Sequence, residues 1–129
     1  MDENQISKEV VDAAIKVHSK MGPGLLESVY EVVLARELES RGLQVRRQVP
    51  IKIEYDGLVF AEGFVADIIV EDKVILELKS VEQLANVHYK QIYTYLKLAD
   101  KRLGMLLNFG TSLMKEGIHR VAYNMRNTQ

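Results

Sequence analysis

Apolar residues recur every three or four positions in three parts of the chain, a spacing that predicts amphipathic helices. These helices are expected at about 5–21, from the Gly22-Pro23-Gly24 loop to about Arg41, and from about Glu82 to Asp100. Pro23 and Gly42 stand where a proline and a glycine commonly begin and end a helix. The buried face predicted for the second helix comprises Leu26, Val29, Tyr30, Val33, Leu34 and Leu38.

Runs rich in apolar and β-branched residues between the second and third helices predict three strands, near 44–55, 58–70 and 73–80. The Tyr55-Asp56-Gly57-Leu58 sequence is typical of a hairpin turn, and Glu71-Asp72-Lys73 has the length of another. A buried run at 103–109 and a final strand near 118–123 follow the third helix. The sequence therefore predicts one α/β (α+β) domain over residues 1–129, with a central αβββαβ order after an extra N-terminal helix.

Composition narrows the class of protein. At 129 residues, of which 47% are hydrophobic, the chain is long enough for one core of ordinary size. The absence of cysteine excludes disulfide scaffolds, thiol catalysis and cysteine-based zinc sites. Because the sequence has no apolar segment of membrane-spanning length and no signal-peptide pattern at its polar start, we expect a cytoplasmic protein with no membrane partner.

Three charged residues interrupt two of the predicted strands. Asp67 lies in the apolar run 63–70, and Glu77 and Lys79 lie in the run 74–79. A carboxylate in a core strand must be paired, hydrated or bound to a metal, because an isolated buried charge is strongly unfavourable. Side chains alternate along a strand, so Glu77 and Lys79 share one face, about 6 to 7 Å apart, while the apolar residues between them point to the other face.

The turn between these two strands determines whether the carboxylates meet. If it centres on Asp72, Asp67 lies directly opposite Glu77 with Cβ atoms about 4.5 to 5.5 Å apart. A shift of one residue would send one carboxylate to the other face. Facing carboxylates are stabilised by a shared proton, a cationic partner or a divalent metal, and hard oxygen ligands suit Mg²⁺ or Mn²⁺. The alternative is an ion-paired Glu77 and Lys79 at a solvent-facing edge of the sheet.

Asp67, followed ten residues later by Glu77-x-Lys79, resembles the catalytic signature of the PD-(D/E)-x-K nuclease superfamily. Upstream, the segment from Gly24 through Glu27 to Tyr30 resembles the GxxExxY motif of a family of small bacterial and archaeal proteins in that superfamily. One departure is alanine rather than proline directly before Asp67. The resemblance implies a restriction-endonuclease-like core, in which a mixed central sheet is flanked by helices and the chemistry takes place at the end of the central hairpin.

The resemblance also implies roles for individual residues. These are Asp67 and Glu77 as ligands of Mg²⁺ or Mn²⁺, Lys79 as a charge stabiliser, Glu27 as an additional acidic residue from a helix, and Gln91 as a polar active-site residue with Tyr95 one turn beyond. Without the resemblance, Glu27 in the first turn of a helix is equally explained by the helix dipole. His88 lies on the same helical stripe as Gln91, and we interpret it as bordering the core.

Three classes of function are consistent with these features. The first, which we favour, is a metal-dependent nuclease acting on DNA or RNA, and the second is a nucleic-acid-binding or regulatory subunit that needs a partner. The third, a structural or oligomeric protein with an ion-paired polar cluster, is disfavoured because an acidic pair beside a lysine has no structural purpose. A homodimer or a protein partner would suit a chain of this size.

Charge is the feature that separates the first two classes. The chain carries 17 Lys and Arg against 18 Asp and Glu, so its net charge of −1 lacks the basic surplus usual in nucleic-acid binders. Basic residues cluster only locally, at Arg36, Arg41, Arg46 and Arg47 and at Lys97, Lys101 and Arg102. The neutral charge favours the partner-dependent subunit, whereas a bound cation could supply part of the field that a nuclease needs.

Overall fold

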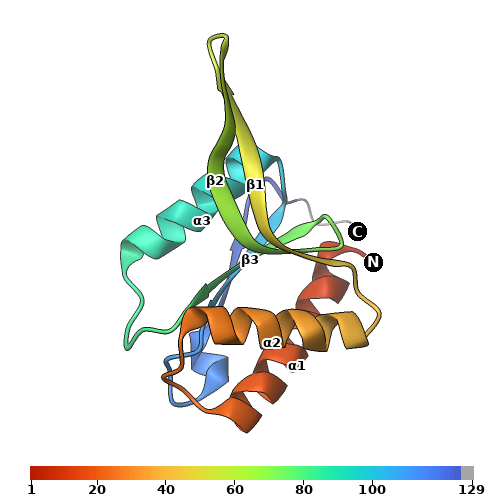
Figure 1. Cartoon of the computed structure of the whole chain (residues 1–129), viewed down its shortest axis with the longest axis vertical. Coiled ribbons are helices and arrows are strands. Elements are labelled where there is room, and N and C mark those ends of the chain that lie inside the picture. Colours follow the sequence, from red (N-terminus) through yellow and green to blue (C-terminus); the bar gives the residue numbers. More distant parts are fainter. Residues whose placement is uncertain (126–129) are drawn as a thin grey trace.

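The computed structural model describes residues 1–125, which form three α-helices, five strands and one 3-10 helix (Figure 1). The helices are α1 (Glu3–Met21), α2 (Glu27–Ser40), α3 (Asn86–Ala99) and the 3-10 helix η1 (Met114–Gly117). The strands are β1 (Val45–Tyr55), β2 (Leu58–Val70), β3 (Val74–Lys79), β4 (Leu103–Asn108) and β5 (Ile118–Ala122). Within residues 1–125 no helix is both long and apolar enough to cross a membrane.

The strands form one mixed sheet in the order β1-β2-β3-β4-β5. β3 and β4 run parallel, and every other neighbouring pair is antiparallel. A parallel pair needs a crossover connection, which α3 provides between β3 and β4. The predicted αβββαβ order after an extra N-terminal helix is confirmed, and the mixed sheet flanked by helices is consistent with a restriction-endonuclease-like fold.

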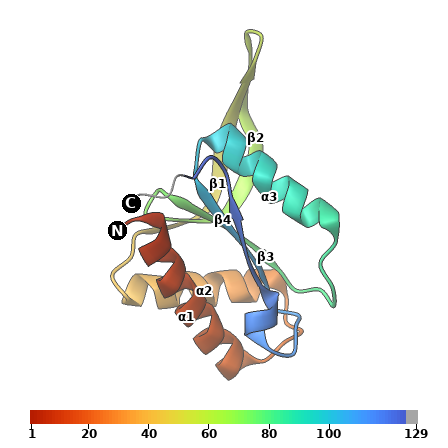
Figure 2. The same cartoon turned by 180° about the vertical axis from the view of Figure 1, so that it is seen from behind.

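Helices cover both faces of the sheet (Figure 2). On one face, α1 and α2 share a core with Val74, Leu76 and Leu78 of β3. On the other face, Ile75 of β3 packs in a smaller cluster with Leu96 of α3. β3 is therefore buried from both sides, as expected for a strand at the centre of a sheet with helices on both faces.

Arg41 joins the two N-terminal helices at the end of α2. Its guanidinium bonds Glu37 of the same helix at 3.0 Å and Asp12 of α1 at 2.8 Å, and it reaches Glu9 of α1 at 3.3 Å. Its side chain is 19% exposed. These contacts fix the direction of α2 across α1.

Tyr30 holds the loop that precedes α2. Its ring is fully buried and stacks on Phe109 with the ring centroids 4.4 Å apart. Its hydroxyl donates to the Gly22 carbonyl and accepts from the Leu25 N–H at 3.1 Å. Gly24 has φ +91°, in the left-handed region that favours glycine. Tyr30 and Gly24 therefore set the turn from which Glu27 begins the helix.

The outer part of the β1–β2 hairpin extends from the body as an arm, which we define as residues 52–63 (Figure 1). β3 pairs with β2 only from Ile68 onward, so it does not support the arm. The β1–β2 register shifts between Ile51 and Ile53, at the base of the arm. Large apolar side chains at the tip are more than half exposed, namely Tyr55, Leu58, Val59 and Phe60.

Two details differ from the sequence-based expectations. α3 begins at Asn86 rather than near Glu82, because the preceding residues cross from the end of β3 to the helix. The Val81 N–H in this crossing donates to Asn108 Oδ1 at 3.1 Å. Leu26 is also 74% exposed rather than buried, because it is the extended residue before α2 and lies outside the helix. Val29 in the first turn of α2 is likewise exposed.

We expect Tyr30→Phe to lower the free energy of unfolding by about 0.5 to 1.5 kcal/mol, because the change removes the hydrogen bonds that the hydroxyl makes with the Gly22 carbonyl and the Leu25 N–H, both partly open to solvent. Urea unfolding measures this loss. Tyr55→Phe is the matched control, since Tyr55 is 73% exposed at the arm tip. Equal stability of the two variants would contradict a structural role for the Tyr30 hydroxyl.

Candidate active site

The register of β2 and β3 is the one that the sequence predicted. Ile68 pairs with Leu76, and the turn centres on Asp72. One position further along each strand, Asp67 lies opposite Glu77. Beyond this point β2 continues against β1 and β3 continues against β4, so the two strands separate at the acidic pair.

Where β2 and β3 separate, the two carboxylates accept hydrogen bonds from backbone N–H groups of the opposite strand. Asp67 Oδ2 accepts the Leu78 N–H at 2.9 Å. Glu77 Oε1 accepts the Asp67 N–H at 3.4 Å. Each acidic side chain thus reaches across the opening to the opposite strand, and the arrangement holds the two carboxyl groups together.

Glu77 is 8% exposed, and its environment favours the protonated carboxyl. Burial, followed by the negative charge of Asp67 and a hydrogen bond between the two side chains, raises the pKa of Glu77 from 4.5 to about 9. The Asp67 N–H and the charge of Lys79 oppose this change in pKa. Near neutral pH, and without a metal, Glu77 therefore keeps its proton.

Lys79 ends β3 and is half-buried. Its charge acts on Glu77, but no ion pair within 4.0 Å joins the two side chains among the described residues. Glu77 is buried rather than placed on a solvent-facing edge. The alternative of a surface ion pair between these residues therefore does not fit the structure.

α3 contributes Tyr95 and Gln91 to the surroundings of the acidic pair. The Tyr95 ring stacks on Phe64 of β2 with the centroids 3.8 Å apart. Burial and then the charges of Glu77 and Asp67 raise the pKa of Tyr95, and a hydrogen bond with Gln91 lowers it. The exposed Gln91 thus lies beside Tyr95, which in turn lies close to the acidic pair.

His88 has a different environment on the same helix. Its Nδ1 accepts the Ala85 N–H at 3.1 Å, so it caps the first turn of α3. His88 is half-buried and uses this ring nitrogen for the backbone at the start of its own helix.

A cavity of about 400 Å³ opens beside Asp67. Glu27 lines it from the first turn of α2, and Asp67 lines it from β2. Glu27 Oε2 also accepts the Ser80 N–H at 3.4 Å, which links α2 to the end of β3. Glu27 and Asp67 therefore line the same cavity from different elements.

The acidic pair, of which Asp67 lines this cavity, has oxygen donors that fit a hard divalent cation. Within residues 1–125 no group of three acidic, histidine or cysteine side chains is close enough to hold a metal. Mg²⁺ commonly binds through one or two carboxylates and leaves its remaining positions to water and substrate phosphate. Asp67 and Glu77 supply that minimum, whereas Glu27 is not close enough to them to complete a three-carboxylate group.

Three polar residues at this cavity form one hydrogen-bonded group that the sequence analysis did not predict. Glu31 of α2 is 6% exposed and accepts from Arg47 and from Gln48 of β1. Gln48 has φ +52°, which is unusual for a residue other than glycine. These contacts span sixteen or seventeen positions, so a local sequence pattern could not reveal them.

Most of the predicted basic clusters are neutralised by ion pairs. Arg46 pairs with Asp72 at 2.9 Å, Lys101 with Asp72 at 3.2 Å, and Arg102 with Asp100 at 2.9 Å. Arg41 binds three acidic side chains, as described above. The clusters therefore do not form a continuous basic surface for a nucleic acid.

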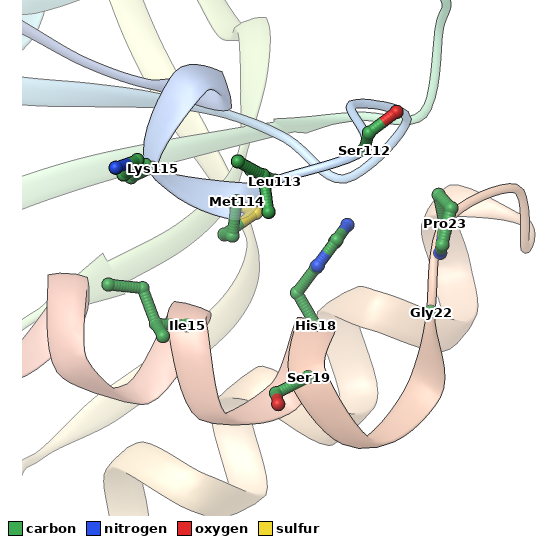
Figure 3. Close-up of a pocket in the computed structure, with 9 residues that line it drawn as sticks. All are labelled: Ile15, His18, Ser19, Gly22, Pro23, Ser112, Leu113, Met114 and Lys115. Atoms are coloured by element: carbon green, nitrogen blue, oxygen red, sulfur yellow. The ribbon is translucent and has the colours of Figure 1, made fainter.

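A second cavity lies between the end of α1 and the segment that leads into η1 (Figure 3). His18 lines it and donates through Nε2 to the Thr111 carbonyl at 2.8 Å. Lys115 is the charged residue of its wall, and no acidic side chain of the described part of the chain lines it. This cavity has no ligand set for a hard cation and lies apart from the acidic pair.

The fold and the acidic pair define an α+β protein of the nuclease-like class. The family model described as the PD-(D/E)XK nuclease superfamily matches residues 4–121, and the chain belongs to that superfamily. Membership implies a nucleic-acid substrate, and proteins of the superfamily generally use divalent metals. Comparison with curated proteins and with solved structures gave no match.

The protonated Glu77 predicts how stability depends on pH in EDTA. Since the folded-state pKa of about 9 lies above 4.5, the folded protein holds the extra proton between these values. Stability from this group is fully present below pH 4.5 and is lost as the pH rises toward 9, with a slope of at most ~1.4 kcal/mol per pH unit.

Glu77→Gln should remove this contribution, because glutamine imitates the neutral carboxyl. Urea unfolding across this pH range measures the difference from the wild type. The control is Glu62→Gln on the exposed arm, which should keep the wild-type slope. An unchanged slope in Glu77→Gln would show that Glu77 is already ionised at neutral pH.

Proposed function

We propose that the chain is a metal-dependent nuclease that hydrolyses phosphodiester bonds in DNA or RNA. The observation that carries this proposal is the direct contact between Asp67 and Glu77, next to Lys79 and a solvent-accessible cavity. Buried facing carboxylates destabilise a fold unless a proton or a cation compensates them. A cation in place of the proton on Glu77 would give this pair a function at the opening of the central hairpin.

Asp67 and Glu77 would hold Mg²⁺ or Mn²⁺ through their carboxylate oxygens. When bound, the cation supplies positive charge that offsets the charge on the phosphate. Lys79 adds an ammonium on the same side and stabilises the negative charge that grows on the phosphate oxygens. Gln91 positions polar groups of the substrate through its exposed amide, and Glu27 contributes an acceptor from the opposite wall of the cavity.

The proposed reaction is hydrolysis with a simple balance of atoms. A water oxygen forms a bond to phosphorus, and the bond from phosphorus to the leaving nucleotide oxygen breaks. The water loses one proton and the leaving oxygen gains one. The residues of the chain contribute by placing the phosphate between Lys79 and the carboxylates and by accepting hydrogen bonds from the attacking water.

We also propose that the chain belongs to the GxxExxY family. Each motif residue has a separate place in the structure: Gly24 adopts the left-handed turn, Tyr30 fixes the loop, and Glu27 lines the active-site cavity. This division explains why the three residue types occur at that spacing and supports the assignment.

Asp67→Asn should remove Mn²⁺-dependent stabilisation and nuclease activity together. The wild type should gain about 2.7 kcal/mol at a Mn²⁺ concentration roughly one hundred times Kd, whereas the variant should gain almost nothing. Thermal unfolding with and without Mn²⁺ gives the first readout, and cleavage of labelled DNA and RNA gives the second.

Two further variants make this experiment specific. Asp56→Asn, at the exposed arm tip, is the matched control and should behave as wild type. Lys79→Ala should keep most of the Mn²⁺ stabilisation while lowering turnover, because lysine acts on the phosphate rather than on the cation. Cleavage that persists in an identically purified Asp67→Asn protein would identify a contaminating nuclease and overturn the proposal.

A second candidate is a nuclease-like subunit that works only with a protein partner. The arm favours it, because its tip exposes Tyr55, Leu58, Val59 and Phe60. Exposed apolar clusters mark interaction surfaces. The arm carries one lysine against three acidic residues, Glu54, Asp56 and Glu62, so it does not suit a phosphate backbone. A second copy of the chain or another protein fits this surface better than a nucleic acid.

Leu58→Ser/Phe60→Ser should weaken self-association if the partner is a second copy. Sedimentation over a range of protein concentrations should show a dimer for the wild type and a monomer for the variant. Val87→Ser on α3 is a control with similar exposure, at 63%. A monomeric wild type that cleaves nucleic acid alone would eliminate the homodimer and the need for a partner.

A further inference from the structure

Arg47 leaves one end of its guanidinium open at the active-site cavity. Nε and Nη2 donate to Glu31 Oε2 at 3.1 and 2.8 Å, so one edge of the guanidinium is occupied. No partner for Nη1 is present within residues 1–125. The Arg47 side chain is 42% exposed, in contrast to 8% for that of Glu31. The Nη1 end is therefore accessible to a ligand in the cavity that Arg47 lines.

Glu31 and Gln48 hold this guanidinium in a defined orientation. Glu31 uses one carboxylate oxygen for Arg47 and the other for Gln48 Nε2, at 2.7 Å. An arginine on a solvated strand normally samples many rotamers, and two bonds to a buried carboxylate remove most of that freedom. The Arg47 guanidinium is thus held in one orientation before a ligand binds.

The backbone of β1 is bent to make this arrangement. Arg47 pairs with Ile68, which packs toward α1 and α2, whereas Val49 pairs with Ala66 on the α3 side. Regular alternation would put Arg47 and Val49 on one face. The left-handed conformation of Gln48 reverses the strand between them, at a cost of about 1 kcal/mol or more. Strain of this kind concentrates at functional sites.

We propose that Arg47 binds a backbone phosphate of the nucleic acid beside Asp67, with Glu31 and Gln48 as positioning residues. The nucleic-acid identity of the ligand rests on the proposed function. The parallel N–H groups at the open end of the guanidinium can donate to two phosphate oxygens at once. A lysine ammonium cannot make this paired contact.

Charge gives a reason for such a contact. The cavity walls carry three acidic residues, Glu27, Glu31 and Asp67, of which Glu31 is paired with Arg47, so a phosphodiester that approaches Glu27 and Asp67 is repelled. Arg47 is the cation of this cavity among the described residues. Its neighbour Arg46 pairs with Asp72 away from the cavity, so it does not supply this charge.

The test compares Arg47→Lys with Arg46→Lys by fluorescence anisotropy. Short labelled DNA and RNA, single- and double-stranded, are titrated in EDTA so that no metal-dependent cleavage interferes. Arg47→Lys keeps a charge for Glu31 but loses the fork, and its Kd should rise roughly ten-fold. Arg46→Lys should bind as the wild type does.

A second variant, Glu31→Gln/Arg47→Met, removes the phosphate contact without leaving a buried charge unpaired. The slope of log Kd against log salt should decrease by about one relative to the wild type, because one phosphate contact is lost. Arg46→Met is its control and should retain more of the slope. Circular dichroism and thermal unfolding establish that each variant is folded, and a purely structural ion pair would change stability but not the salt slope.

The outcomes separate this inference from the proposed function. Equal affinity and equal salt slopes for the Arg46 and Arg47 variants would overturn the phosphate contact, even if the wild type cleaves nucleic acid. Arg47-dependent binding without any cleavage in Mg²⁺ or Mn²⁺ would support the contact and overturn the nuclease. A wild type that binds none of the labelled strands would overturn both.

Discussion

The hydrogen bonds between the two acidic side chains and the backbone, at the point where β2 and β3 separate, are the interaction on which the site depends. β2 leaves β3 to continue with β1, which would leave the Asp67 and Leu78 N–H groups without partners from the ladder. Glu77 and Asp67 accept those N–H groups with their side chains. Unpaired buried N–H groups are costly, so the same contacts that complete the sheet also hold two carboxyl groups together.

The structure compensates two buried glutamates in different ways. Glu31 has a permanent cation, Arg47, and an amide, Gln48, so both of its oxygens are occupied. Glu77 retains a proton instead, because burial and Asp67 raise its pKa. A proton can be exchanged for a metal ion, whereas an arginine covalently attached to the chain cannot. This difference separates a carboxylate suited to cation binding from one suited to positioning.

Local sequence predicted the parts of the structure that depend on periodicity and turns. The Glu71-Asp72-Lys73 turn and the strict alternation on β3 were enough to place Asp67 opposite Glu77. The sequence could not predict that Arg41 also binds Glu9 and Asp12, or that Arg46 binds Asp72 and Arg47 binds Glu31, because these partners lie at least sixteen positions away. It also gave no sign that Gln48 adopts a left-handed conformation, since only the packing on both sides of β1 requires it. The roles of the site residues in chemistry stay predictions.

The stacking of Phe64 on Tyr95 connects the base of the arm to the surroundings of the acidic pair. Phe64 lies on β2 one residue beyond the arm, and Tyr95 lies beside the acidic pair. A change in the angle of the arm must slide one ring over the other or carry Tyr95 with it, because the two rings are in full contact. A molecule bound at the exposed tip would therefore be connected to the surroundings of Glu77 through β2 and these stacked rings, at a distance from the cavity itself.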